Sequence, residues 1–270
     1  MVASNGMEMA RIWRSSFIAG AEVMSVAYRH RAFPQHSHDG YVIGVVTEGA
    51  ERLDVGGTSY IAGAGSVLQI HPGEVHANAA IGSSILKYDV LYLPEPALRP
   101  YLLTGREGSA LSFMRPVSDD PSLFEIVRNA HVCLAADAGR LEQESAILAL
   151  LLALTRSSAP IVRRLPEPTV PIGLAREFID THFASTFGLQ TLSRLTGLSV
   201  YHLVRSFKKS VGLSPLAYRN QRRITSAKAM LLQGVPIAEV ALSVGYSDQS
   251  HFTRHFQKLV GLSPGRYAQQ

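Results

Sequence analysis

Residues 197–215 read GLSVYHLVRSFKKSVGLSP, and residues 245–264 read GYSDQSHFTRHFQKLVGLSP. The two stretches share one pattern and the same closing GLSP. The pairs that recur at an offset of 49 residues are His202 and His251, Arg205 and Arg254, and Phe207 and Phe256. Gly197 and Gly245 are 48 residues apart, so the second copy has one extra residue in its turn. An internal repeat predicts that one structural unit occurs twice in the fold, so this chain is expected to contain two copies of one supersecondary unit.

Each copy has the pattern of a helix-turn-helix. Apolar residues three apart open a short first helix, because such positions lie on one helix face. A glycine that accepts positive φ ends this helix, and a serine then caps the second helix. The matching positions are Leu189 and Ile237, Leu192 and Val240, Gly197 and Gly245, and Ser199 and Ser247. The units span about 189–210 and 237–259.

The second helix of each unit is predicted to read DNA. Its apolar residues are four apart and point inward, which leaves a polar and basic stripe free to enter a major groove. The inward residues are Leu203, Phe207, Phe252 and Phe256. The predicted DNA contacts are Tyr201, Val204, Arg205, Lys208, Lys209, Gln249, Ser250, His251, Arg254 and Lys258. Taken alone, one copy is also compatible with a plain helical bundle that has a solvated charged face.

These DNA contacts differ in their expected roles. Arg205 and Arg254 are the candidates for base edges, since arginine bonds guanine in a bidentate way. The lysines are assigned to phosphates, which add affinity but little sequence choice. A connecting helix that starts at Pro215 and runs to about Gln233 would hold the two recognition helices about 34 Å apart, in successive major grooves. Arg219, Arg222 and Arg223 lie on or near this connector, where they could contact phosphates or pair with acids inside the fold.

The C-terminal 100 residues resemble the DNA-binding domain of the AraC/XylS transcriptional regulators. The matching segments are HLVRSFKKSVGLSPLAYRNQRR, SAKAMLL and IAEVALSVGYSDQSHFTRHFQKLVGLSPGRY. The resemblance implies a sequence-specific regulator whose partners are promoter DNA, a small-molecule effector and RNA polymerase. It also implies that Arg223, on the connecting helix, is structural. Two alternatives stay open: a constitutive DNA-binding factor with a scaffold-only barrel, and a metal-dependent enzyme with a DNA-binding tail.

Composition and charge fit a two-domain protein of this kind. The chain has 270 residues, 46% hydrophobic and 17% charged. Residues 171–270 hold 12 Lys+Arg and 4 Asp+Glu, a net +8, whereas residues 1–156 hold 12 and 16, a net −4. A basic module on an acidic body is expected of a polyanion-binding domain joined to a separate partner domain. The single Cys133, the lack of a signal-peptide pattern and an apolar run (146–155) too short for a bilayer predict a cytoplasmic location and no membrane.

Residues 1 to about 110 read as an antiparallel β-sandwich or β-barrel. Short runs rich in β-branched and aromatic residues, including 25–33, 41–49 and 85–94, alternate with Gly, Pro and Asp turns. Two segments, FPQHSHDGYVIGVVTEG and GAGSVLQIHPGEVHAN, together resemble the two motifs of a cupin barrel. The predicted fold is therefore α+β with two domains, a cupin-like barrel followed by an all-α domain.

The barrel is predicted to hold a small-molecule ligand. His36 and His38 are two apart and share one face of a strand, and His76 comes from the other motif. These three, with Tyr41, are the candidate ligand-binding residues, and structural histidines are the alternative. Metal-binding cupins carry a glutamate four or five positions after the His-x-His pair, where this chain has Val42 and Ile43. This departure from the cupin pattern counts against a metal and against metal-dependent chemistry, so no metal, cofactor or catalytic residue is assigned. A metal ion held by the three histidines stays an alternative.

Two helices and a linker complete the predicted domain plan. Pro121 opens a helix that ends near Gly139, and residues 140–157 form a second helix. The second half of this helix is apolar nearly all round, so it must be buried. The resemblance implies that this pair carries dimerisation, while an intramolecular helix pair is the alternative. The plan is a barrel and dimerisation domain over 1–156, a proline-rich linker over 157–171 and a DNA-binding domain over 172–270.

Overall fold

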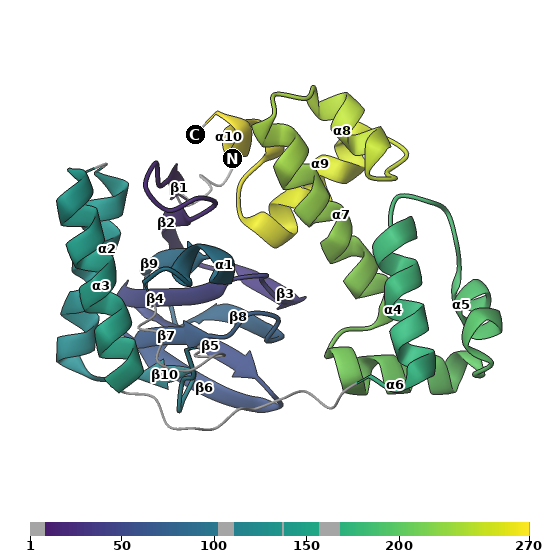
Figure 1. Ribbon diagram of the computed structural model, residues 1–270, viewed down its shortest axis with the longest axis horizontal. Coiled ribbons are helices and arrows are strands. Elements are labelled where there is room, and N and C mark those ends of the chain that lie inside the picture. The colour runs from purple at the N-terminus through teal and green to yellow at the C-terminus, as the bar shows by residue number, and fades with distance from the viewer. Residues whose placement is uncertain (1–8, 102–110, 137, 157–167, 270) are drawn as a thin grey trace. The chain divides into compact units, whose positions relative to one another are not determined.

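The computed structural model describes residues 9–101, 111–136, 138–156 and 168–269, which fall into two compact units (Figure 1). The N-terminal unit is built on β-sheets, and the C-terminal unit is helical. This confirms the predicted fold class. Most of the predicted linker, residues 157–167, lies outside the described residues, and its last two positions already belong to a helix that begins at Val170.

Antiparallel strands form two sheets in the described part of the N-terminal unit. The six-stranded sheet has the order β1 (Met9–Arg14), β2 (Glu22–Tyr28), β9 (Leu86–Leu93), β4 (Tyr41–Glu48), β7 (Val67–Ile70) and β10 (Val117–Ser118). The four-stranded sheet has the order β3 (Ala32–His36), β8 (His76–Ile81), β5 (Ala50–Val55) and β6 (Thr58–Gly63). The run predicted as one strand over 25–33 is two strands, because the chain bends at Arg29 and His30.

Strand β4 lies in the middle of the six-stranded sheet, which explains its continuous apolar sequence. Its residues from Tyr41 to Val46 are all buried, as expected for a strand covered on both faces. Side chains alternate along a strand, and Tyr41, Ile43 and Val45 belong to the core that the sheet shares with the helices. Val42, between them, therefore points to the opposite face, toward the barrel interior.

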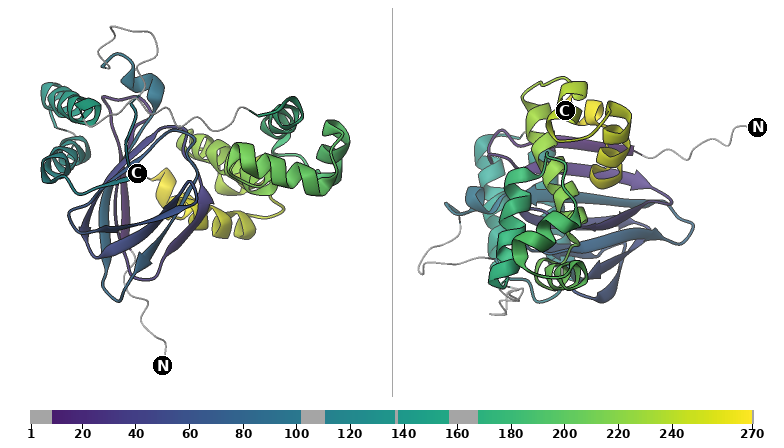
Figure 2. Two further views of the ribbon diagram at one scale, coloured as in Figure 1. Left: turned by 90° about the horizontal axis from the view of Figure 1, so that it is seen from below. Right: turned by 90° about the vertical axis from the view of Figure 1, so that its right-hand side faces the viewer.

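Helices α2 (Pro121–Ala135) and α3 (Arg140–Arg156) pack side by side against the outer face of this sheet, as Figure 2 shows. Asp120 caps α2 by accepting from the backbone N–H groups of Ser122 and Leu123, and Pro121 takes the first helical position, where its missing N–H costs nothing. Helix α2 ends at Ala135, four residues before the predicted Gly139. The short α1 (Glu95–Leu98) follows β9.

The C-terminal unit contains the repeat found in the sequence. Helices α5 (Leu189–Thr196) and α6 (Val200–Val211) form the first helix-turn-helix, and α8 (Ile237–Ser243) and α9 (Gln249–Val260) form the second. Helix α7 (Pro215–Leu232) connects them over nearly the predicted range. Helix α4 (Val170–His182) packs on the first unit, and α10 (Pro264–Ala268) follows the second.

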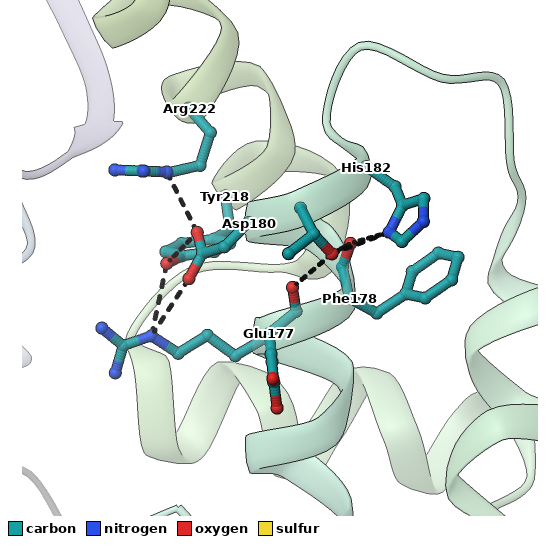
Figure 3. Close-up of polar contacts among 8 residues, drawn as sticks. Glu177, Phe178, Asp180, His182, Tyr218 and Arg222 are labelled. Carbon is teal, nitrogen blue, oxygen red and sulfur yellow. Dashed lines mark hydrogen bonds and ion pairs between the residues drawn. The ribbon is translucent and has the colours of Figure 1, made fainter.

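A polar cluster joins α4 to α7 (Figure 3). The Tyr218 hydroxyl donates to Oδ1 of Asp180 at 2.8 Å, and Nε of Arg222 lies 3.0 Å from the same oxygen. Nε of Arg176 donates to the Tyr218 hydroxyl at 3.3 Å. Asp180 on α4 thus holds two side chains of α7, which fixes the connector against α4, the helix that packs on the first helix-turn-helix. Among the helices that the structure describes, none has the length and apolarity needed to cross a membrane.

Candidate DNA interface and effector site

Helix α6 has an anchored back and an exposed front. The Ser199 hydroxyl accepts from the backbone N–H of His202 and caps the helix, as predicted. Leu203 and Phe207 are fully buried, and Phe207 packs edge-on against Tyr218 of α7. The opposite side chains are exposed, and Tyr201 is 68% exposed. An aromatic ring left this open on a basic helix is available to a partner.

Helix α9 repeats the arrangement with one difference in its cap. Asp248, not the predicted Ser247, accepts from the backbone N–H of His251, and the Ser247 hydroxyl donates to the Asp248 carboxylate. The offset of 49 residues pairs Ser199 with Asp248, whereas the extra turn residue shifts Ser247 out of register. Hydrogen bonds from these donors lower the pKa of the Asp248 carboxyl.

The predicted DNA contacts fall on the exposed faces of the two helices. All ten are exposed except Val204, which is half-buried. In α6 they follow spacings of three and four residues. In α9 Ser250, Arg254 and Lys258 are four apart, and Gln249 and His251 flank Ser250 in the first turn. The structure therefore brings each set together on one surface, and their contact with bases or phosphates stays a prediction.

Arg223 ties the segment between α4 and α5 to the turn of the second repeat from inside the fold. Its Nε donates to the Phe183 carbonyl at 2.7 Å, its Nη2 donates to the Ser185 carbonyl at 3.5 Å, and its guanidinium lies 5.4 Å from the ring centre of Tyr246. Burial lowers the pKa of Arg223. The structural role predicted for Arg223 is confirmed, and Arg219 has a similar one through the Phe187 carbonyl at 3.1 Å.

Tyr246 occupies the turn of the second unit. Its hydroxyl is hydrogen-bonded to Nδ1 of His255, and its ring packs against Phe252. Burial raises the pKa of Tyr246 to about 12, and burial lowers the pKa of His255. Both groups are therefore neutral near pH 7, and they orient the back of α9 without adding charge to its front.

In the N-terminal unit, the three predicted histidines converge. One ring nitrogen from each of His36, His38 and His76 lies within 4.8 Å of the others. His36 and His76 are buried, and the His38 ring lies 5.3 Å from that of His76 and 4.9 Å from that of Tyr92. Burial lowers the pKa of His36, which favours its neutral form.

Tyr41, the fourth predicted ligand residue, is not part of this cluster. Its side chain is 1% exposed and belongs to the core between sheet and helices. Its hydroxyl donates to the Leu111 carbonyl at 3.4 Å, and its ring packs edge-on against Phe113. Because Tyr41 stands at the first position of β4, alternation sends its side chain to the outer face of the sheet.

The barrel interior contains polar residues that the sequence interpretation missed. Glu51 is 1% exposed, and its carboxylate accepts from Nδ2 of Asn78 at 2.9 Å. Burial raises the pKa of Glu51 to about 7. The Tyr28 hydroxyl donates to that of Tyr88 at 3.2 Å. Burial raises the pKa of both tyrosines and of Tyr92, and the Glu51 carboxylate adds to each shift, so these groups lie near one another.

This group of side chains, which we call the interior polar cluster, comprises Glu51, Asn78, Tyr28, Tyr88 and Tyr92. A carboxyl, an amide and three phenol groups supply hydrogen-bond donors and acceptors within an apolar barrel. A signal for Glu51 was present, because Glu51, Leu53 and Val55 alternate on the buried face of β5. Small-molecule sites combine apolar walls with a few placed polar groups, and this interior has both.

Comparisons with known proteins match both the sheet-based unit and the helical unit. An AraC-like ligand-binding domain model matches residues 19–151, and a helix-turn-helix domain model matches residues 192–270. The HTH-type transcriptional regulator YbfI of Bacillus subtilis is 34% identical over 83% of this chain and 84% of its own length. The arabinose operon regulatory protein of Escherichia coli K12 is 27% identical over 80% of this chain and 75% of its own length.

Among solved structures, ToxT of Vibrio cholerae with a bound unsaturated fatty acid shares the fold. Its TM-score is 0.58 at 12% identity, over 95% of this chain and 96% of that one. The sequence relatives and the two domain models cover both the sheet-based and the helical unit of this chain. The chain therefore belongs to the AraC family of DNA-binding transcriptional regulators.

Proposed function

We propose that this regulator reads promoter DNA with α6 and α9 and is controlled by a small uncharged, hydroxyl-bearing effector in its barrel. The observation that carries the proposal is the pair of capped helices whose predicted contact stripes are exposed while their apolar faces are buried. Two such helices on one connector suit two successive major grooves. The N-terminal unit then has the role of sensing.

The exposed stripes combine two kinds of DNA contact. Arg205 and Arg254 stand at matching positions and carry the guanidinium that bonds guanine edges in a bidentate way, with Tyr201, Val204, Gln249, Ser250 and His251 beside them. Lys208, Lys209 and Lys258 are at or near the last turn of their helices, where they suit phosphates. This division assigns sequence choice to the arginines and most salt dependence to the lysines.

The interior polar cluster favours the effector class. The phenol hydroxyls and the Asn78 amide offer both donors and acceptors, and Glu51, with its pKa near 7, accepts from hydroxyl groups or donates when protonated. An anionic effector would meet this acid inside the barrel, whereas an uncharged polyol would satisfy it. His36, His38 and His76 line the predicted ligand site next to Tyr92.

Control by an effector requires unequal affinity for two states of the protein. We infer a homodimer, because α3 leaves Leu141, Leu148 and Leu152 exposed at 75%, 40% and 49%, on a helix whose other face is buried. Contact with RNA polymerase, a cytoplasmic location and the lack of enzymatic activity complete the proposal, and the relatives' naming as transcriptional regulators supports them.

The test is binding of the full chain to DNA fragments from around its own gene, over a salt series, with and without a panel of polyols and sugars. We expect selective binding that weakens steeply as salt rises, because counterions are released. One polyol should shift the affinity, and a fatty acid serves as the contrasting ligand. Selective binding that no small molecule changes would instead identify a constitutive factor with a scaffold barrel.

A further inference from the structure

Three histidines from different segments bring ring nitrogens to one point in the N-terminal unit. His36 ends β3, His76 begins β8, and His38 precedes β4. Their potential ligand atoms all lie within 4.8 Å of one another. Two of the three rings are buried, so this grouping is part of the fold and not a chance meeting of surface side chains.

The hydrogen bonds of the two buried histidines orient them. Nδ1 of His36 lies 2.8 Å from the Pro34 carbonyl, and Nδ1 of His76 lies 3.0 Å from the Glu74 carbonyl. A carbonyl only accepts, so each Nδ1 carries the hydrogen, and the neutral ring keeps its lone pair on Nε2. Metal-bound histidines show this pattern, in which the second nitrogen donates to a backbone or carboxylate oxygen.

We propose that His36, His38 and His76 bind one divalent transition-metal ion through three ring nitrogens, with Zn²⁺ as a fitting member of the class. Imidazole is a ligand of choice for such ions, and Zn–N bonds of about 2.0–2.1 Å place the nitrogens of a tetrahedral site about 3.4 Å apart. Closing this distance requires a shift of His38, the half-buried member, which lies in the segment between β3 and β4.

The donor set differs from that of a metal-binding cupin in a way that matters chemically. The positions that hold the glutamate there are Val42 and Ile43, which are 6% and 0% exposed. The three imidazoles are neutral, so the ion keeps its full charge and at least one open coordination position. Water or an effector oxygen would take that position. This inference does not depend on the proposed effector control.

The experiment uses the full-length chain, freed of metal by dialysis against a chelator and then titrated with Co²⁺. We expect one equivalent to bind, with visible absorption typical of nitrogen ligands, and Zn²⁺ to displace it while Mg²⁺ does not. His38→Ala should reduce the affinity by more than the roughly 10–100-fold that loss of an outer-shell partner costs. His30→Ala, which alters an exposed histidine in the β2–β3 turn, should leave it unchanged.

A second measurement keeps the test decisive if His38→Ala fails to fold. In the unaltered protein, ¹⁵N NMR of the histidine rings should show the Nε2 signals of His36 and His76 moving on Zn²⁺ addition while their Nδ1–H groups persist. Folded protein that binds no Co²⁺, or that binds it equally well in His38→Ala, would overturn the proposal. DNA binding that survives such a failure would leave the regulator function intact, so the two outcomes are separable.

Discussion

Glu51 is a single buried carboxyl whose ionisation should set part of the pH response of the barrel. Burial raises its pKa from 4.5 to about 7. Between these values the folded state keeps a proton that the unfolded state has lost, so its contribution to stability falls as pH rises from about 4.5 to 7. Glu51→Gln removes the free-energy cost of ionising a buried carboxyl. We therefore expect the free energy of unfolding of the variant to exceed that of the unaltered protein by about 3 kcal/mol at pH 8, and by little at pH 4.5.

Urea unfolding at the two pH values measures this gain. Glu48→Gln is the matched control, because Glu48 ends β4, the strand that precedes β5 in the chain, and its side chain is half exposed beside Lys87. Other groups that titrate in the same pH range, such as His36 and His131, contribute equally to the unfolding free energies of variant and parent. Their contributions therefore cancel in the difference. An equal effect of Glu51→Gln at both pH values would show that the carboxyl is not ionising as described.

Arg254 and Lys258 lie one turn apart on α9, and their removal should have different consequences for DNA binding. Arg254→Ala should weaken binding by roughly 1–3 kcal/mol at one base position and relax the choice of base there. Lys258→Ala should weaken binding evenly across sequences and reduce the salt slope by about one. Selection of binding sites from a randomised DNA pool, repeated at two salt concentrations, separates these effects. A uniform loss for Arg254→Ala would reassign it to a phosphate.

For single residues, sequence patterns predicted the positions that follow from helical periodicity and from the repeat. They failed for residues whose side-chain direction depends on how the strands pair. The contact stripes of α6 and α9 follow from helical periodicity alone. Tyr41 was expected beside the histidines, but the start of β4 directs it outward. Glu51 was missed because a charged residue normally indicates an exposed face, although its alternation with Leu53 and Val55 pointed inward.

Among elements, the second turn is under the tightest steric constraint. Gly245 has φ of +88°, and a Cβ there would lie 2.1 Å from the Ala184 carbonyl oxygen and 2.7 Å from Nη2 of Arg223. Gly245→Ala must therefore displace the Arg223 bridge as well as strain the backbone. We expect a loss of roughly 3 kcal/mol or more in the stability of the helical unit, with DNA binding reduced in parallel.

Gly234→Ala is the matched control for this prediction. Gly234 has φ of +79°, but a Cβ there would meet no atom within 4 Å. Its cost should be the backbone term alone, about 1–2 kcal/mol. Urea unfolding followed by helical circular dichroism compares the two variants. Similar losses of stability in both variants would mean that Ala184 and Arg223 shift to accommodate the new methyl group without a loss of stability.

Helices were easier to predict than strands because their signals are local. Pro121, Pro215 and the repeated GLSP mark helix starts that the structure retains. The strand ends were less accurate, since pairing partners far along the chain decide them, and the run over 25–33 divides at a bend. The second repeat has one extra residue in its turn, so the offset of 49 residues matches the Ser199 cap with Asp248 and not with Ser247.

For the whole molecule, the exposed apolar residues of α3 make the oligomeric state testable. Leu152 is 49% exposed, so Leu152→Lys should cost the monomer little while placing a charge in an apolar interface. We expect the dimer to dissociate and the affinity for a DNA fragment with two sites to fall, measured by analytical ultracentrifugation and gel shift. Thr58→Lys, a charge added at an exposed position of β6, is the control. Dimers that persist in Leu152→Lys would place the interface elsewhere.

The recognition helices α6 and α9 follow each other in a fixed order on one chain, and their exposed residues differ. On the proposed contacts, a DNA segment that suits Tyr201 and Arg205 first and Ser250 and Arg254 second does not suit them when it is turned around. Each binding site is therefore asymmetric and has a defined orientation along the double helix. Inverting a site in place, without moving it, would exchange the half of the protein that faces the transcription start, and the response of the gene should change with it.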